Sequence, residues 1–138
     1  MAECKVGIVG VGKMGEYHVG VLSDMREAEL VGIVDSDQKR AKIVSERYKT
    51  SNYKDYKDLF KKIDAVVVAV PTSMHYSIGK EFIEAGIHTL LEKPCTDDLR
   101  QAEELFDIAA KKNVTLHIGH VERFNGAVQE LFKIVKDP

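Results

Sequence analysis

A glycine-rich segment, Gly-Val-Gly-Lys-Met-Gly, begins at Gly10 and is the first part of the sequence whose residue types indicate chemistry. It follows an apolar run and opens a helical pattern, which is the context in which Gly-x-Gly-x-x-Gly binds a dinucleotide. Gly10 would allow a tight turn, Gly12 would let a pyrophosphate approach the backbone, and Gly15 would let the helix pack closely. The first turn of that helix, with Lys13 and Met14, would then contact the phosphates. A loop that merely needs positive φ angles is the alternative.

An acidic residue, Asp35, ends the second apolar run, 20 residues after the glycine segment. In a dinucleotide site, an acid at this place accepts hydrogen bonds from the adenosine ribose and repels a 2′-phosphate. The sequence therefore favours NAD over NADP as cofactor, although Lys39 and Arg40 lie close enough to weaken the repulsion. Asp35 or Asp37 could instead cap the following helix, and we expect Asp37 to do so.

A charged pair, Glu92 and Lys93, follows apolar residues 88–91 and precedes Pro94. Ligands of a doubly wound sheet bind outside the carboxyl ends of its strands. The pair should therefore share a cleft with the residues at the ends of the other apolar runs, which are Gly10, Asp35, Val70 and Gly119. There Lys93 could exchange a proton with an alcohol while hydride passes to a nicotinamide ring. The alternative is a solvated lysine paired with Glu92.

The histidines and cysteines give weaker signals. His75 follows a strand end and begins a helix, so it could contact the cofactor or substrate, or it could cap the helix. His117 lies within an apolar run and is predicted to be a core residue, whereas His18 is predicted to pack or to face solvent. Cys4 and Cys95 match no disulfide framework and no metal spacing, so we expect no metal site. The sequence specifies no partner that would make Cys95 a nucleophile.

Short continuous apolar runs alternate with helical patterns along the chain. The runs are residues 5–10, 29–35, 64–70, 88–91 and 114–119, and residues 51–56 could hold a short edge strand. Continuous apolar residues are typical of strands buried on both faces of a parallel sheet. The alternation predicts an α/β fold, a doubly wound Rossmann-type parallel sheet of about six strands with helices on both faces. Residues 1–138 fit one such domain.

Three helical segments carry apolar stripes that should pack on the sheet. The stripes are Met14, Tyr17, Val21, Leu22 and Met25; Leu99, Ala102, Leu105, Phe106 and Ala109; and Phe124, Val128, Leu131, Phe132 and Val135. Thr96, followed by two aspartates, predicts a helix start, and Gly86 predicts a helix end.

Charge and hydropathy exclude several kinds of partner. The formal net charge of −2 gives no reason to expect nucleic acid or an acidic membrane. No apolar run approaches the ~20 residues that cross a bilayer, and the N-terminus shows no signal-peptide pattern. We therefore expect a cytoplasmic protein that acts on a small molecule.

Four segments together resemble one family, the glucose–fructose oxidoreductase, inositol dehydrogenase and rhizopine-catabolism group (Gfo/Idh/MocA). They are GVGKMG at 10–15, VAVPTSMHYSI at 68–78, LLEKP at 90–94 and GHVERFN at 119–125. The resemblance covers essentially the whole chain. It implies a nicotinamide-dependent oxidoreductase that acts on a sugar, nucleotide-sugar or polyol hydroxyl. The last segment is most similar to the branch that oxidises nucleotide-activated amino sugars.

The resemblance also implies roles for the charged segments. Lys93 would lie beside the nicotinamide and the substrate as general acid/base, and Glu92 would help to hold the cofactor ribose. Pro94 would shape a turn that can contain a cis peptide. Arg123 and Asn125 would belong to a segment that closes over the nicotinamide.

The loop after the third major strand would face the cofactor. The resemblance assigns this role to Val70, Pro71, Thr72 and His75. Members of the family often have asparagine after the proline, where this chain has Thr72, and this difference weakens the case for a side-chain contact there.

The family continues into a C-terminal α+β domain that supplies most of the substrate pocket, the partners of the lysine and the oligomer interface. We therefore expect this chain to be the N-terminal part of a longer, homo-oligomeric dehydrogenase, which binds NAD(H) without turning over a sugar by itself. The alternative is a stand-alone, non-catalytic NAD(H)-binding or sensing module.

Overall fold

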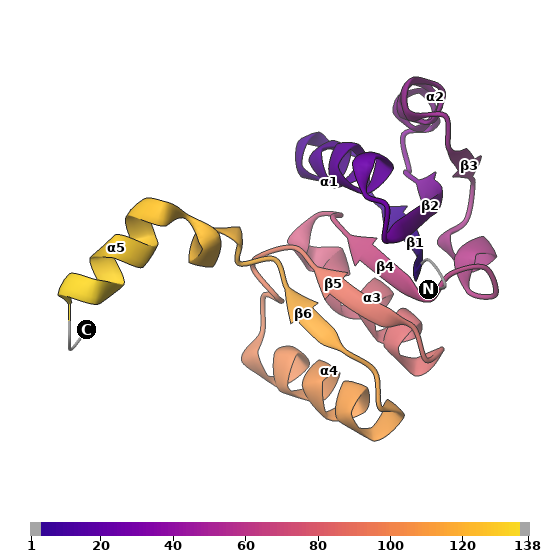
Figure 1. The fold of residues 1–138 in the computed structure, drawn as a ribbon. Helices are drawn as coiled ribbons and strands as arrows, with labels where there is room; N and C mark the ends of the chain where they lie inside the picture. Colours follow the sequence, from indigo (N-terminus) through magenta and orange to yellow (C-terminus); the bar gives the residue numbers. More distant parts are fainter. Residues whose placement is uncertain (1–3, 136–138) are drawn as a thin grey trace.

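The computed structural model describes residues 4–135. Its centre is a sheet of six parallel strands in the order β3-β2-β1-β4-β5-β6 (Figure 1). The strands are β1 (Cys4–Val9), β2 (Ala28–Val34), β3 (Ser51–Tyr53), β4 (Ala65–Val68), β5 (His88–Leu91) and β6 (Leu116–Ile118). The apolar runs therefore form strands where the sequence predicts them, and residues 51–56 contain the short edge strand β3.

Helices cover both faces of the sheet. α1 (Lys13–Asp24) and α2 (Gln38–Tyr48) pack on one face, and α3 (His75–Glu84) and α4 (Leu99–Lys112) pack on the other (Figure 1). The 3₁₀ segments η1 (Tyr56–Leu59), η2 (Thr72–Met74) and η3 (Val121–Phe124) lie in the connections, and α5 (Gly126–Ile134) follows η3. This is the doubly wound, Rossmann-like α/β fold that the sequence predicts, with the direction of winding reversing next to β1.

Local sequence signals set the helix ends. Asp37 caps α2, because its side chain accepts hydrogen bonds from two backbone N–H groups of the first turn, each at 3.1 Å; the predicted cap is confirmed. Gly86 follows α3 with a φ of +81°, as a helix end requires. The helix predicted to start near Thr96 begins later, since Asp98 is the residue that caps α4.

Two apolar clusters hold the helices to the sheet. On the face covered by α3 and α4, Phe82 is fully buried and meets Phe60 edge to face, with ring centroids 4.9 Å apart. On the face covered by α1 and α2, Ile8, Val19 and Val44 belong to the second cluster. Full burial of such a side chain contributes about 1.5–3 kcal/mol, so these contacts hold the helices against the sheet.

The packing face of α1 differs from the predicted apolar stripe. The buried residues of α1 are Gly15 and Val19. The exposed members of the stripe are Met14, Tyr17, Val21 and Met25, so the predicted face was wrong. A Cβ on Gly15 would lie 1.9 Å from the Gly10 carbonyl oxygen. Because α1 lies this close to the loop after β1, position 15 on its buried face must be glycine. A search for apolar side chains in the sequence does not detect such a position.

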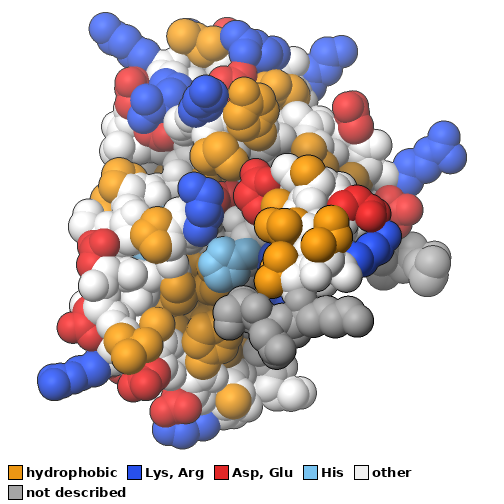
Figure 2. Space-filling model, turned by 90° about the vertical axis from the view of Figure 1, so that its left-hand side faces the viewer, with side chains coloured by type: hydrophobic (Ala, Val, Ile, Leu, Met, Phe, Trp, Pro, Cys, Tyr) orange, Lys and Arg blue, Asp and Glu red, His pale blue; other side chains and the backbone are white. Residues whose placement is uncertain are grey.

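The apolar stripes of α4 and α5 are buried only in part. On α4, Leu105 and Ala109 are buried as predicted, whereas Leu99 and Phe106 are exposed. α5 projects away from the sheet (Figure 1), and the exposed members of its stripe are Phe124, Leu131, Phe132 and Val135. Figure 2 views the side on which α5 projects and shows hydrophobic side chains at that surface. Neither α5 nor any other helix within residues 4–135 is long and apolar enough to cross a bilayer.

A shallow hollow of about 210 Å³ opens on the face of the sheet opposite α3 and α4. Its lining includes Val67, Leu90 and His117. His117 is exposed rather than buried, so the prediction of a core histidine was wrong. The reason is that β6 is the edge strand. This side chain lines a part of the α1–α2 face that those two helices do not cover.

Candidate functional site

A cavity of about 600 Å³ lies at the carboxyl edge of the sheet, outside the ends of β2, β1 and β4. The reversal of winding between β1 and β4 opens a crevice here, because the loops after these strands leave toward opposite faces. The predicted residues that line the cavity are Gly10, Gly12, Lys13, Met14, Asp35, Val70 and Pro71. The topology thus brings together segments that lie far apart in the sequence.

The structure explains the glycine at each of the three loop positions differently. Gly10 has a φ of +88°, and a Cβ there would approach the Ala69 carbonyl oxygen to 2.6 Å, so the turn requires glycine. Gly15 allows the close packing of α1. Around Gly12, by contrast, a Cβ would meet no atom of the described chain within 4 Å. The fold does not need glycine at this position, which leaves room for a ligand to approach the backbone from the cavity.

The N-terminus of α1 opens into the same cavity. Gly12 is the N-cap residue, and no side chain within residues 4–135 caps the first turn. Lys13 and Met14, the first residues of the helix, line the cavity. The N–H groups of a first helical turn carry partial positive charge and lack partners within the helix. They can therefore bind a phosphate group.

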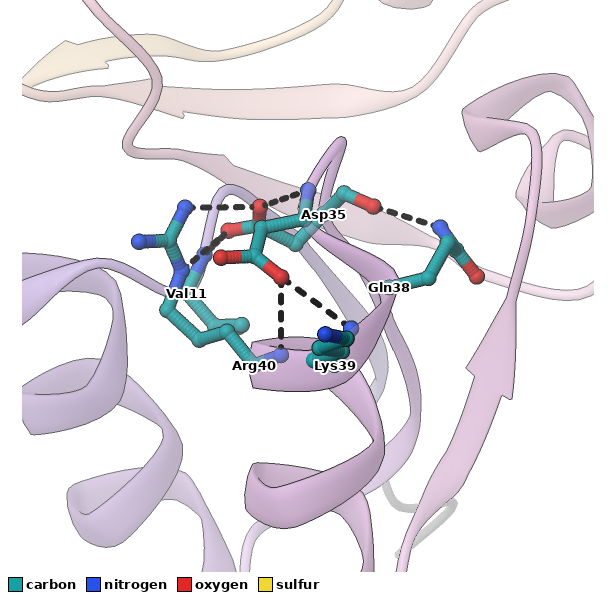
Figure 3. Close-up of polar contacts among 6 residues, drawn as sticks. Val11, Asp35, Gln38, Lys39 and Arg40 are labelled. Carbon is teal, nitrogen blue, oxygen red and sulfur yellow. Dashed lines mark hydrogen bonds and ion pairs between the residues drawn. The ribbon is translucent and has the colours of Figure 1, made fainter.

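Asp35 lies at the end of β2 and is 5% exposed. Its Oδ2 accepts a hydrogen bond from the Val11 N–H at 2.7 Å, and its Oδ1 accepts one from the Asp37 N–H at 2.8 Å. Arg40 donates two more, from Nη2 to Oδ1 at 2.9 Å and from Nε to Oδ2 at 3.3 Å (Figure 3). One carboxylate therefore joins the glycine loop, the turn after β2 and the first turn of α2.

Opposing effects act on the protonation of Asp35. Burial by itself would raise its pKa, but the hydrogen bonds from Arg40 and from two backbone N–H groups outweigh burial and lower the pKa below the ordinary 3.8. The carboxylate is therefore charged at neutral pH. A charged carboxylate at this place can accept hydrogen bonds from hydroxyl groups and repels anions.

A second buried carboxylate, Glu92, follows β5 and is 5% exposed. Its Oε1 lies 2.7 Å from Nε2 of His18, and its Oε2 accepts a hydrogen bond from the Lys93 N–H at 3.1 Å. A Cβ on Gly119 would lie 3.0 Å from Oε1, so the end of β6 leaves space for this carboxylate. Sequence reasoning missed the contact with His18. The contact could have been suspected from the sequence, because His18 lies about one turn into the helix that starts at the ligand edge of the sheet.

Lys93 lies beyond the end of β5 with an exposed side chain. The peptide bond between Lys93 and Pro94 is cis, in agreement with the turn that the resemblance implies. The Glu92 carboxylate pairs with His18 rather than with the Lys93 ammonium group, so the alternative of a Glu92–Lys93 ion pair is not what the structure contains.

His75 is buried, with 1% of its surface exposed. Its Nε2 lies 2.9 Å from the Val70 carbonyl oxygen, and its Nδ1 lies 2.9 Å from the Pro94 carbonyl oxygen. Its side chain does not cap α3. The ring instead ties the cavity-lining loop after β4 to the turn that follows Lys93.

The residues that line the cavity include neither Glu92, Lys93 and His75 nor the remaining predicted residues. Thr72 begins η2, directly after the cavity-lining Pro71. Arg123 is exposed on η3, beyond β6, and Asn125 caps α5 by accepting a hydrogen bond from a backbone N–H at 2.9 Å. Contacts of these residues with a cofactor stay predictions.

Cys95 is half-buried next to Pro94. Burial raises the pKa of its thiol, which disfavours the nucleophilic thiolate. This agrees with the expectation that Cys95 is not a nucleophile.

Several cavity residues were not predicted as contacts. They are Ser36, Arg40, Lys54, Tyr56, Met74 and Ile78. Ser36 could have been found, because it follows a predicted strand on its carboxyl side. Lys54 lies inside the predicted segment 51–56, and only the observed end of β3 at Tyr53 places it beyond a strand. The others lie within helical or 3₁₀ segments, and only the packing of α2, η1, η2 and α3 brings them to the cavity.

Comparison with known proteins accounts for this arrangement. The model of an oxidoreductase family with an NAD-binding Rossmann fold, GFO_IDH_MocA, matches residues 4–120. The matched range contains the glycine loop, Asp35 and the Glu92–Lys93 pair. The chain belongs to this family. The resemblance of the four sequence segments to Gfo/Idh/MocA proteins is thereby confirmed, and the chain is an NAD-binding Rossmann domain of the oxidoreductase type.

Similar Gfo/Idh/MocA proteins include proteins named as dehydrogenases. UDP-N-acetylglucosamine 3-dehydrogenase of Acidithiobacillus ferrooxidans is 31% identical over 131 residues, which cover 95% of this chain and 41% of that protein. Inositol 2-dehydrogenase of Corynebacterium glutamicum is 28% identical over 137 residues, covering 96% and 41%. The chain thus spans about two fifths of the length of these relatives.

Solved structures of Gfo/Idh/MocA proteins share the fold. The Acidithiobacillus ferrooxidans enzyme superposes with a TM-score of 0.89 at 30% identity, over 97% of this chain and 44% of that chain. GenD2 from gentamicin A biosynthesis, in complex with NAD, superposes with a TM-score of 0.83 at 28% identity, over 86% of this chain and 35% of that chain.

Proposed function

We propose that this chain binds NAD(H) across the carboxyl edge of its sheet and serves a dehydrogenase that transfers hydride between a sugar, nucleotide-sugar or polyol carbon and the nicotinamide. The observation that carries the proposal is the open space at Gly12, next to the uncapped start of α1. Relatives named for a nucleotide-sugar and for inositol support the substrate class.

The residues present fit such a cofactor. The first turn of α1 would bind the pyrophosphate, and Asp35 would accept hydrogen bonds from the adenosine ribose, which favours NAD over NADP. The cavity continues from Asp35 past the glycine loop to Val70 and Pro71. The next strand end along the sheet, that of β5, carries Glu92 and Lys93.

Lys93 is the proposed general acid/base. When bound, the nicotinamide supplies the hydride chemistry. The Lys93 amine would take up the hydroxyl proton in oxidation and return it in reduction. Glu92, held by His18 and by the Lys93 N–H, would keep its carboxylate directed at a ribose hydroxyl.

Changing Gly12→Ala tests the binding mode. The added methyl group meets nothing in the folded chain, so the thermal unfolding midpoint should stay close to that of the unchanged protein. The same methyl would collide with a pyrophosphate on the backbone, so NADH affinity should fall roughly tenfold or more. Titration calorimetry and thermal unfolding measure the two effects.

Gly126→Ala is the matched control for Gly12→Ala. Its Cβ also meets no described atom within 4 Å, and Gly126 begins α5, away from the cavity. It should leave NADH affinity unchanged. Equal affinities of the Gly12 variant and the unchanged protein would contradict the binding mode, and no NADH binding by the unchanged protein would contradict the proposed function.

A further inference from the structure

The ring of His75, buried at the start of α3, lies between backbone carbonyl groups. Its Nε2 is 2.9 Å from the Val70 carbonyl oxygen, and its Nδ1 is 2.9 Å from that of Pro94 and 3.3 Å from that of Cys95. A carbonyl oxygen accepts hydrogen bonds and cannot donate them, and a neutral imidazole has a single N–H group. Contacts on both sides are therefore hydrogen bonds only when each ring nitrogen carries a proton.

The charged groups on the neighbouring elements do not neutralise such a ring. No ion pair of the described chain includes His75, and burial raises the pKa of the Cys95 thiol, which keeps it uncharged. The remaining groups of α3, of α4 and of the turn after β5 have other partners or face solvent. Glu92 pairs with His18, Glu104 with Lys80 and Glu81 with Lys57, Asp98 caps α4, and Lys93 and Asp97 are exposed.

The two sides of the ring belong to different parts of the proposed site. Val70 lines the cavity, whereas Pro94 directly follows Lys93, the proposed general acid/base. A ring with two protons holds both segments at a fixed separation. Loss of either proton turns a bare nitrogen toward a carbonyl oxygen, so one contact opens. A cofactor that touches both segments favours the ring with two protons, because binding and protonation are then linked.

We propose that His75 is a positioning residue that, with a proton on each ring nitrogen, ties the turn of Lys93 to the cavity loop at Val70, so that NADH binding takes up a proton. This rests on the proposed function. NADH affinity is then highest at acidic pH and decreases as the pH rises, because the ring loses its second proton and one of the two segments is released.

The first test uses the unchanged chain. Calorimetric titration with NADH, repeated in buffers of different ionisation enthalpy, should show proton uptake on binding, and NADH affinity should fall roughly tenfold between about pH 6 and about pH 8. NMR of the isotope-labelled histidine rings should show both nitrogens of His75 protonated in the NADH complex at neutral pH. One bare nitrogen in that complex would overturn the inference.

The second test uses three variants in the same titrations. His75→Gln carries an amide whose charge does not change with pH, so it should bind NADH more weakly and without proton uptake. His117→Gln is the matched control, because His117 is exposed on the edge strand and does not line the cavity; it should keep both affinity and uptake. His18→Gln should also keep the uptake, since His18 contacts Glu92 rather than the carbonyl groups.

The variants also separate the possible failures. Uptake that persists in His75→Gln, or that disappears only in His18→Gln, would overturn the inference. Thermal unfolding shows whether each variant is folded, and if His75→Gln is not, the ring measurement on the unchanged chain decides. Failure of the unchanged chain to bind NADH would overturn the proposed function itself.

Discussion

Asp35 shows how much one side chain can determine at the residue scale. Its carboxylate accepts hydrogen bonds from the glycine loop, from the turn after β2 and from α2 (Figure 3). The same group is the acceptor that an adenosine ribose would need. In the proposed binding mode, the stability of the domain and the recognition of the cofactor would therefore depend on the same charge.

The stability of the domain should depend on the charge of Asp35. Its pKa is lowered in the folded state, so the carboxylate stabilises the fold above the ordinary value of 3.8 and loses this effect as the pH falls through the lowered pKa. Asp35→Asn replaces one carboxylate oxygen by an NH₂ group, which cannot accept a hydrogen bond, and leaves a neutral oxygen, which accepts more weakly. The donors from Val11, Asp37 and Arg40 then lose part of their partner. Urea unfolding should show a loss of about 1–3 kcal/mol at neutral pH.

The pH dependence distinguishes charge from shape in this variant. The difference in unfolding free energy between the unchanged protein and Asp35→Asn should shrink as the pH is lowered below 3.8. A difference that stays constant down to strongly acidic pH would show that packing, and not charge, is responsible.

At the scale of elements, side chains that bridge loops hold the ligand edge together. His75 of α3 contacts the carbonyl oxygens that follow β4 and Lys93. His18 of α1 contacts Glu92 after β5. Each histidine joins a helix on one face to strand ends from other parts of the chain, so the positions of the loops depend on how the helices pack.

The packing of α3 should therefore be sensitive to its core residue. Phe82 is fully buried and contacts Phe60 and Tyr56, with ring centroids 4.9 and 5.7 Å away. Phe82→Ala should lower the free energy of unfolding by about 3–5 kcal/mol, measured by urea denaturation. Phe106→Ala on α4, where the side chain is 47% exposed, is the matched control and should cost far less. Similar losses in both variants would contradict this account of the core.

At the scale of the whole molecule, the sheet order decides where ligands can bind. The strands β3, β2 and β1 and the strands β4, β5 and β6 wind in opposite directions from the centre. The cavity lies at the reversal, and Lys93 lies one strand farther along the same edge. The chain spans about two fifths of the length of the relatives named as dehydrogenases. α5 lies beyond β6 (Figure 1) and carries exposed apolar side chains.

Binding and turnover should be separable in this protein. We expect the chain by itself to bind NADH, because the described residues that line its cavity fit the cofactor. We do not expect it to reduce NAD with sugars by itself. In a form of the protein that oxidises a sugar, Lys93→Met should lower kcat roughly 10²- to 10⁴-fold, with little change in NADH affinity. Steady-state kinetics and calorimetry measure the two quantities.

Lys112→Met, in the last turn of α4, is the control for Lys93→Met and should leave kcat unchanged. Full activity of the Lys93 variant would show that another group moves the proton. A form that binds NADH and turns over none of the sugars, nucleotide-sugars or polyols would instead favour the non-catalytic module.

The strands, their parallel orientation and the ligand edge could all be predicted from the sequence, because continuous apolar runs and the Gly10–Gly15 loop are local patterns with a physical reason at each residue. The caps at Asp37 and Gly86 were predictable for the same reason.

Only the tertiary structure decided which helix faces pack and what the acids contact. Tyr17 and Val21 look like core residues in the sequence, yet Gly15 and Val19 are the buried residues of α1. At Gly15 the loop after β1 comes too close for any larger residue. The Asp35–Arg40 and Glu92–His18 contacts are likewise set by how α1 and α2 sit on the sheet. Side chains 74 residues apart in the chain, such as His18 and Glu92, meet through packing that no local pattern specifies.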